Sequence, residues 1–236
     1  MTVKGVIDNG NTRCKAGLFK DGDLIVVKHF SNLQEAFEWL KDNGVTQVMV
    51  SSVRADQTFN TTLEYYTVNK DLKLPFVNLY KTPETLGADR IAAMAAAAVL
   101  YPDNTSLVFD IGTCMTIDFL NERKEYNGGN ISPGLNMRLK AMNQMTGRLP
   151  LSSVDEIQLP MGNSTLSALA NGAMLGLQYE IDGYIQSTLE KNPDTCIVLC
   201  GGDAHYFEKP LKYKIFANPN LVLQGLYHLL ILNAKS

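Results

Sequence analysis

The stretch VIDNGNTRCKAGLF, residues 6–19, sets the fold of the start of this chain. Two apolar runs flank an Asn-Gly pair, and because both residues tolerate positive φ the pattern predicts a β-hairpin. The first strand ends in Asp8, which is followed by Gly10, Asn11 and Thr12. A phosphate-binding turn needs the same residue types, because a glycine lets backbone N–H groups approach phosphate oxygens. The stretch is therefore either a plain chain reversal or a nucleotide-binding turn.

A second copy of this pattern occurs about half a chain later. FDIGT, residues 109–113, again ends an apolar run with Asp-x-Gly and is followed by another strand pattern. One Asp-x-Gly is common by chance, but two copies that each open a β-β turn indicate duplicated lobes around a cleft. Strand hairpins followed by alternating helices and strands indicate an α/β fold. We therefore predict two α/β lobes, residues 1–105 and 106–236.

Periodicity and turn residues predict the individual elements. Helices are expected over residues 33–41, 89–101, 135–145, 165–190 and 221–234. Strands are expected over residues 3–8, 15–19, 24–29, 47–53, 76–80, 107–112, 115–120 and 195–200. The glycines and proline of residues 128–134 predict a loop. One face of the long fourth helix carries Leu166, Leu169 and Ala173.

Composition restricts the class of protein. With 236 residues, of which 45% are hydrophobic and 19% charged, the chain is typical of a soluble globular protein with a large core. A net charge of −3 argues against sequence-independent nucleic-acid binding, which needs a basic face. An acid occurs too early for a signal peptide, and no apolar run reaches the ~20 residues of a membrane span. We expect a cytoplasmic protein without membrane or nucleic-acid partners. Cys14 and Cys114 are expected to be space-filling side chains.

Two strand-end acids facing one cleft suit phosphoryl transfer, which depends on positioning and charge neutralisation. Carboxylates cannot bind a triphosphate directly, so Asp8 and Asp110 imply an intervening cation, Mg²⁺. No Gly-x-x-x-x-Gly-Lys-Ser/Thr occurs, and no Gly-x-Gly-x-x-Gly follows the first strand. These absences argue against a P-loop enzyme and a Rossmann dehydrogenase. The pair Gly201-Gly202 would let an adenosine approach the backbone, but such a pair is more often a plain turn.

Each candidate residue also has a purely structural explanation. Asp8 alone is typical of an Asx-turn, and Asp89 alone of a helix N-terminus, where the dipole favours an anion. Tyr80 fits a half-buried strand position, and Thr165 fits a helix cap. The joint pattern, rather than any single residue, favours a functional site.

Five motifs in order resemble those of type III pantothenate kinases, and together they span nearly the whole chain. DNGNTRCK (residues 8–15), GADR (87–90), DIGTCMT (110–116), GGNISPG (128–134) and GG (201–202) match DxGNTxxK, GxDR, DxGTAxT, GGxIxPG and GG. The departures are Cys114 for alanine and Asn9 for an aliphatic residue. The resemblance implies the actin/hexokinase-like fold of two ribonuclease-H-like lobes with a nucleotide cleft. It also implies ATP-dependent phosphorylation of pantothenate to 4′-phosphopantothenate, the first step of coenzyme A biosynthesis.

The resemblance implies a role for each matching residue. The residues that would bind ATP are Asp8, Asn9, Gly10, Asn11, Thr12, Arg13, Cys14, Lys15 and Thr113. Those that would bind pantothenate are Tyr80, Gly87, Ala88, Asp89, Arg90 and Thr165, with Asp89 as the catalytic residue. Asp110 would bind a monovalent cation, K⁺ or NH₄⁺, in addition to the Mg²⁺ that accompanies ATP. Members of the family are homodimers, which makes the helix face with Leu166, Leu169 and Ala173 a candidate interface. Ordinary core packing explains that face equally well.

Two alternatives stay open. One is another kinase of the same superfold, acting on a sugar or on acetate. A sugar site needs several carboxylates and amides, whereas Asp89 and Arg90 offer one carboxylate and one cation, which suits a hydroxy acid. The other is a nucleotide-dependent regulatory or accessory protein of the same fold, which would not need an alcohol-orienting acid such as Asp89.

Overall fold

The computed structural model describes residues 3–10, 14–52, 59–158 and 160–234, which form two compact units. The first contains Met1–Asn104, Phe119–Gly128 and Asn220–Ser236, and the second contains Thr105–Asp118 and Gly129–Pro219. The C-terminal segment therefore packs with the N-terminal one. The predicted lobes, 1–105 and 106–236, are consecutive in the sequence, and their boundaries stay a prediction.

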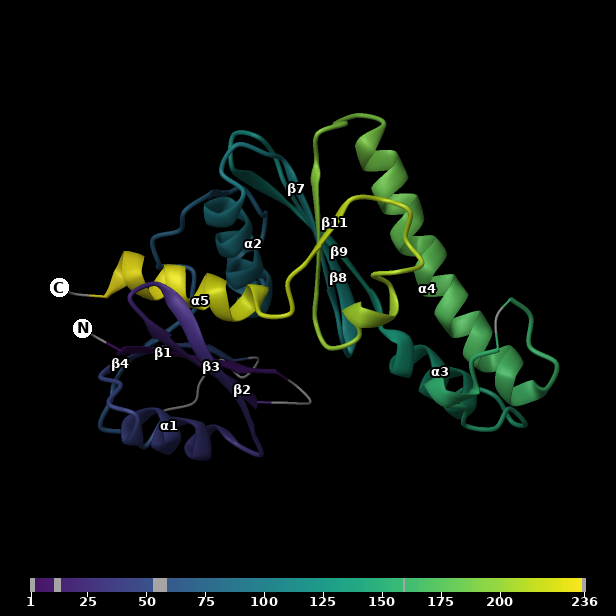
Figure 1. The fold of residues 1–236 in the computed structure, drawn as a ribbon, viewed down its shortest axis with the longest axis horizontal. Coiled ribbons are helices and arrows are strands. Elements are labelled where there is room, and N and C mark those ends of the chain that lie inside the picture. Colours follow the sequence, from purple (N-terminus) through teal and green to yellow (C-terminus); the bar gives the residue numbers. More distant parts are fainter. Residues whose placement is uncertain (1–2, 11–13, 53–58, 159, 235–236) are drawn as a thin grey trace. The chain divides into compact units, whose positions relative to one another are not determined.

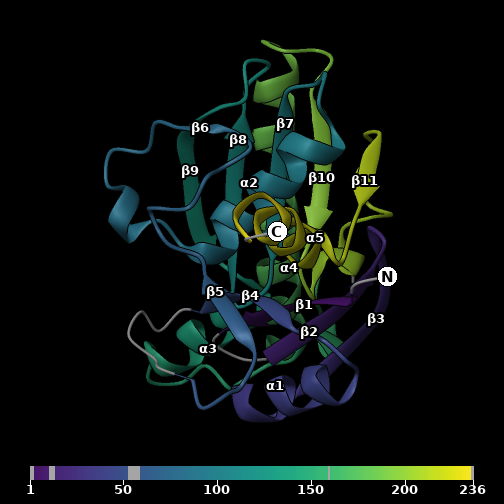
Figure 2. The same ribbon diagram turned by 90° about the vertical axis from the view of Figure 1, so that its left-hand side faces the viewer.

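The first unit contains a five-stranded sheet in the order β3-β2-β1-β4-β5 (Figure 2). Its strands are β1 (Val3–Asn9), β2 (Cys14–Lys20), β3 (Asp23–Phe30), β4 (Gln47–Ser52) and β5 (Glu64–Thr67). β1 runs antiparallel to β2 and parallel to β4. The hairpin predicted from residues 6–19 is confirmed, with Asp8 opposite Lys15. β5 was not predicted, because its sequence, EYYT, is short and does not alternate apolar and polar residues.

Helices cover both faces of this sheet (Figure 1). One face packs against α1 (Leu33–Asp42), and the other packs against α2 (Ala88–Leu100) and α5 (Leu221–Asn233). Ile7 belongs to the core under α1, together with Phe37 and Leu40. Because neighbouring side chains on a strand point to opposite faces, Asp8 points to the face that α2 and α5 cover.

Close packing of two helices fixes the position of α2. Every residue of α2 from 90 to 98 is buried. A Cβ built on Gly225 of α5 would lie 1.8 Å from the carbonyl oxygen of Ala92, so the two backbones are in direct contact. The run of small alanines in α2 allows this close approach. The contact between the two helices fixes the position of the start of α2, which carries Asp89, relative to the sheet.

The second sheet has the strand order β11-β10-β7-β8-β9-β6. Its strands are β6 (Val77–Asn78), β7 (Ser106–Ile111), β8 (Cys114–Leu120), β9 (Glu125–Pro133), β10 (Cys196–Cys200) and β11 (Ile215–Ala217). The expected loop over residues 128–134 is wrong, because β9 continues to Pro133. Glycine, asparagine and proline have low strand propensity, and the ladder of the sheet overrides that preference here.

The second unit contains the α-helices α3 (Leu135–Gln144) and α4 (Thr165–Leu189). Ser164 is the N-cap of α4 and forms a capping box with Ser167. Ala173 of the apolar stripe is buried within the chain, whereas Leu166 and Leu169 are half-exposed. Among the helices of the described residues, none combines the length and apolar character that crossing a membrane requires.

Candidate functional site

Asp8 lies at the end of β1, between two polar residues of the neighbouring strands. Lys15 of β2 and Ser51 of β4 occupy the paired positions on its two sides. Burial, followed by the negative charge of Asp89, raises the pKa of Asp8 to about 6, while Lys15 and a hydrogen bond with the Ser51 side chain act in the opposite direction. Sequence reasoning missed Ser51. Its signal is a polar residue near the end of an otherwise buried strand, VMVSS, that pairs in parallel with β1.

The residues next to Asp8 are only partly within the described chain. Asn9 donates from Nδ2 to Oγ of Ser52 at 3.5 Å, a long hydrogen bond between β1 and β4. Cys14 is buried, and burial, followed by the charges of Asp8 and Glu35, raises the pKa of its thiol to about 11. This thiol stays protonated at neutral pH, as a space-filling side chain should. The predicted ATP-binding residues Asn11, Thr12 and Arg13 lie outside the described residues.

The first turn of α2 presents a carboxylate. Gly87 is the N-cap, and Oδ1 of Asp89 accepts a hydrogen bond from the backbone N–H of Arg90 at 2.8 Å. A Cβ built on Gly87 would lie 2.5 Å from the same Oδ1, so a larger residue would displace the carboxylate. The half-buried Asp89 is close enough to Asp8 to raise its pKa. The first unit thus brings Asp8 of the first motif close to Asp89 of the second motif.

Arg90 is buried, although it carries a positive charge. The residue is 5% exposed, and its Cζ lies 5.6 Å from the ring centroid of the half-buried Tyr80. A guanidinium over an aromatic face is attracted by the electrons of the ring, and this attraction grows when the pair is removed from water. The predicted substrate residues Tyr80, Asp89 and Arg90 therefore belong to one region of the first unit.

The second unit holds Asp110 and the second glycine-rich turn. Asp110 lies near the end of β7, paired with Cys200 of β10. Gly201 follows β10 with a φ of 90°, and a Cβ there would lie 2.4 Å from both Oδ1 of Asp110 and the carbonyl oxygen of Ile111. Two oxygens thus converge beside Gly201. Thr113 is exposed in the turn between β7 and β8.

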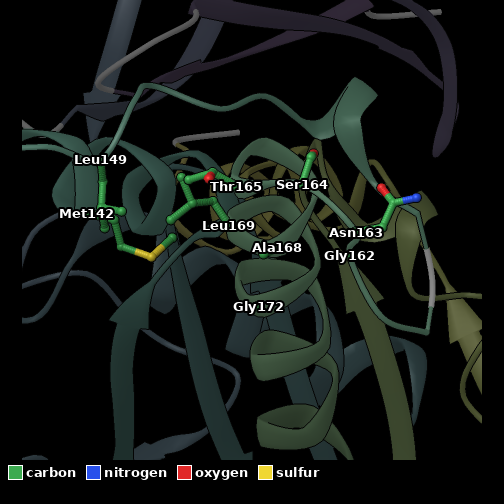
Figure 3. Close-up of a pocket in the computed structure, with 9 residues that line it drawn as sticks. All are labelled: Met142, Leu149, Gly162, Asn163, Ser164, Thr165, Ala168, Leu169 and Gly172. Atoms are coloured by element: carbon green, nitrogen blue, oxygen red, sulfur yellow. The ribbon is translucent and has the colours of Figure 1, made fainter.

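Thr165 lines a pocket of about 620 Å³ in the second unit (Figure 3). It is the first residue of α4, and the N-cap that the alternative interpretation assigned to it is Ser164 instead. Both apolar and polar groups surround the pocket, which is lined by Met142, Leu149, Gly162, Asn163, Ser164, Thr165, Ala168, Leu169 and Gly172. Sequence reasoning missed Met142 and Leu149, because nothing in the sequence relates the end of α3 to the start of α4.

Hydrogen bonds fasten the segment before α4 to the helix itself. The side chain of the buried Asn171 accepts from the backbone N–H of Gln158 and donates to its carbonyl oxygen, both at 2.8 Å. Oγ of Ser152 donates to the carbonyl oxygen of Leu166 at 2.8 Å. The wall of the pocket near Thr165 is therefore held in place by side chains that do not line it.

Comparison with known proteins identifies the fold and the family. Among solved structures, a ROK hexokinase from Thermus thermophilus is 13% identical with a TM-score of 0.52, and the match covers 97% of this chain and 98% of the other. A Campylobacter jejuni protein assigned to the Baf family of transcriptional activators has a TM-score of 0.64 at 17% identity, covering 96% and 97% of the two chains. These likenesses show the actin/hexokinase-like fold.

The sequence comparisons are more specific. The type III pantothenate kinase of Cytophaga hutchinsonii is 39% identical over 231 residues, which cover 97% of this chain and 98% of that protein. That of Bacteroides fragilis strain YCH46 is 39% identical over 236 residues and 97% of both chains. The profile described as type III pantothenate kinase matches residues 6–187. The chain therefore belongs to the type III pantothenate kinase family.

Proposed function

We propose that this chain transfers the γ-phosphoryl group of ATP to pantothenate and forms 4′-phosphopantothenate, the first step of coenzyme A biosynthesis. The observation that carries the proposal is the start of α2, where the Asp89 carboxylate and the buried Arg90 guanidinium follow each other close to Asp8. Pantothenate has one carboxylate and one primary hydroxyl to be phosphorylated. The Arg90 guanidinium complements the carboxylate of pantothenate, and the Asp89 carboxylate complements its hydroxyl.

ATP would be bound by Asp8, Gly10, Lys15 and the other residues of the first motif, with Thr113 from the second turn. Asp8 suits the accompanying Mg²⁺, because a carboxylate whose ionised form is disfavoured in the protein alone gains most from a nearby cation. Magnesium commonly uses one or two protein carboxylates together with the phosphates. When bound, it would neutralise charge on the transferred phosphoryl group.

Pantothenate would be bound by Tyr80, Gly87, Ala88, Arg90 and Thr165. The fork geometry of Arg90 suits bidentate pairing with the substrate carboxylate. Asp89 would accept a hydrogen bond from the primary hydroxyl and aim its oxygen at the γ-phosphorus.

The role of Asp89 follows from its position in the first turn of a helix. Its Oδ1 accepts a hydrogen bond from the backbone N–H of Arg90, and this bond fixes the direction of the carboxylate. In a loose transition state the alcohol proton leaves late. Asp89 would therefore act mainly by orienting the hydroxyl and would receive its proton as the new P–O bond completes.

We also propose a monovalent-cation site, a cytoplasmic location and a homodimer, as the family resemblance implies. Asp110 would bind K⁺ or NH₄⁺, and the convergence of its Oδ1 with the Ile111 carbonyl oxygen beside Gly201 offers the hard oxygen donors that such an ion prefers. The enzyme would be a cytoplasmic homodimer. The half-exposed Leu166 and Leu169 of α4 are a surface that a second copy would cover.

The test is ATP turnover with pantothenate, in the presence and absence of K⁺, against a panel of sugars and other hydroxy acids. We expect turnover that depends on both pantothenate and K⁺. Phosphorylation of a sugar from the panel in preference to pantothenate would favour the alternative kinase. ATP hydrolysis indifferent to every acceptor would favour the regulatory alternative, which the likeness to the Baf family protein makes worth testing.

A further inference from the structure

A series of aromatic contacts leads away from the guanidinium of Arg90. Its Cζ lies 5.6 Å from the centroid of the Tyr80 ring, and that ring is stacked on Tyr126 with centroids 6.1 Å apart and planes inclined by 23°. Tyr126 in turn makes an edge contact with Phe76 at 6.0 Å and 77°. We call Tyr80, Tyr126 and Phe76 the ring series. All three residues and Arg90 belong to the first unit.

The two rings behind Tyr80 in the ring series are both buried. Tyr80 is half-buried, whereas Phe76 is 7% exposed and Tyr126 is fully buried. Stacked aromatic pairs resist displacement, because the contact depends on ring geometry as well as on buried area. Tyr126 is therefore the fixed ring of the series. It supports Tyr80, the ring that contacts Arg90.

Backbone pairing fastens Tyr80 to the strand that carries Tyr126. β6 runs parallel to β9, with Asn78 opposite Tyr126. The N–H of Leu79 donates to the carbonyl oxygen of Tyr126 at 2.9 Å, and Oδ1 of Asn78 accepts from the N–H of Tyr80 at 3.1 Å. A shift of β9 would therefore move Tyr80 as well.

Gly128 limits the Tyr80 ring from a second direction. It has a φ of 128°, which L side chains rarely adopt, and a Cβ there would lie 3.1 Å and 3.2 Å from Cδ2 and Cε2 of Tyr80. The backbone of β9 thus lies directly against the ring. Tyr126 and Gly128 together leave Tyr80 little freedom to turn away from Arg90.

We propose that Tyr126 is a positioning residue for substrate binding: by holding the Tyr80 ring, it fixes the Arg90 guanidinium where a substrate carboxylate must meet it. The inference rests on the proposed function for the identity of that substrate. It assigns this role to the ring of Tyr126, which makes the contact with Tyr80.

Two substitutions at position 126 separate the ring from the rest of the side chain. Tyr126→Phe keeps the stack and should leave the KM for pantothenate within about twofold of wild type. Tyr126→Leu removes it and should raise that KM about fivefold to tenfold, the upper part of the effect expected for one lost aromatic pair, with the KM for ATP unchanged. Tyr227→Leu is the matched control, because it removes the stacked Phe19–Tyr227 pair from the same unit. It should change neither KM.

A double-mutant cycle tests whether Tyr126 acts through Tyr80. Once Tyr80→Leu has removed the intervening ring, Tyr126→Leu should raise the KM for pantothenate no further. Additive effects of the two substitutions would overturn the proposal. So would a Tyr126→Leu variant that raises the KM values for ATP and pantothenate alike, since that is the behaviour of a merely structural residue.

A readout without substrate keeps this inference separate from the proposed function. Phenylglyoxal modifies accessible guanidinium groups, and mass spectrometry of the digested protein reports on Arg90 alone. Tyr126→Leu should accelerate the modification of Arg90 severalfold, while Tyr126→Phe and Tyr227→Leu should not. An unchanged rate in Tyr126→Leu overturns the positioning role even if the wild-type enzyme phosphorylates pantothenate. An increased rate supports the positioning role even if the wild-type enzyme does not phosphorylate pantothenate.

Discussion

Asp8 on β1 and Asp89 at the start of α2 lie close enough for their negative charges to interact. Burial, and then the charge of Asp89, raises the pKa of Asp8 to about 6. Two candidate functional carboxylates, separated by most of the first unit in sequence, are thus coupled electrostatically. The coupling makes the protein alone an unfavourable environment for an ionised Asp8, which is the condition in which a bound cation contributes most.

This coupling predicts a gain in stability when Asp8 is neutralised. Above pH ~6 the folded protein must hold Asp8 ionised against its environment, whereas below pH ~3 the group is protonated in both the folded and unfolded states. Asp8→Asn should therefore increase the free energy of unfolding at pH 8 by about 1–3 kcal/mol and change it little at pH ~3. Chemical denaturation of the ligand-free protein at both pH values measures the difference. Asp103→Asn, at an exposed turn, is the control, and an equal effect at both pH values would contradict the assignment.

A second prediction concerns the orientation of the acceptor. Asp89→Asn keeps the size of the side chain but removes its charge and weakens its hold on the substrate hydroxyl. The kcat with pantothenate should fall by at least about 10²-fold, with ATP still bound. Steady-state kinetics and nucleotide titration measure the two effects. Glu84→Gln, in the exposed 3₁₀ turn before α2, is the matched control. Near-normal turnover of Asp89→Asn would remove Asp89 from the catalytic role.

A third prediction is that replacing Gly201 destabilises the protein, whereas replacing Gly202 does not. Gly201→Ala would require a left-handed backbone of a residue with a Cβ, and that Cβ would meet Oδ1 of Asp110 at 2.4 Å. The strained backbone and the displaced carboxylate should lower the free energy of unfolding by at least about 2 kcal/mol. Gly202→Ala meets nothing within 4 Å and is the stability control. Thermal unfolding compares the two. Equal melting temperatures would mean that Asp110 is not held against Gly201.

Asn171 predicts how firmly the wall of the Thr165 pocket is held. Asn171→Ala leaves the backbone N–H and C=O of Gln158 without this partner, and lost hydrogen bonds of this kind cost about 1–3 kcal/mol. Denaturation should show that loss. Hydrogen exchange should show faster exchange at the amide of Gln158, with α4 itself protected as before. Gln178→Ala, on the same helix, is the control. Unchanged exchange at Gln158 would contradict the role of Asn171 as a clamp.

Much of the fold could be predicted from the sequence, because hydrophobic period and turn chemistry are local. The hairpin after Asp8, the alanine-rich α2 and the long α4 all follow from residues adjacent to them in the chain. The errors occur where pairing between strands, rather than the local sequence, determines the secondary structure. β5, β9 and β11 are strands because a neighbouring strand pairs with them, and their own residues give little indication of it.

The sequence by itself also determined the candidate site as a set of motifs, because strand-end acids, glycines and helix starts are chemical features of short segments. Only the tertiary structure decided which of them act together. The packing of α5 on α2 puts Asp89 near Asp8, and the pairing of β6 with β9 puts Tyr126 under Tyr80. Ser51, Tyr126 and Asn171 have no motif of their own. Their roles arise from contacts between segments distant in sequence, and one sequence carries no direct record of such contacts.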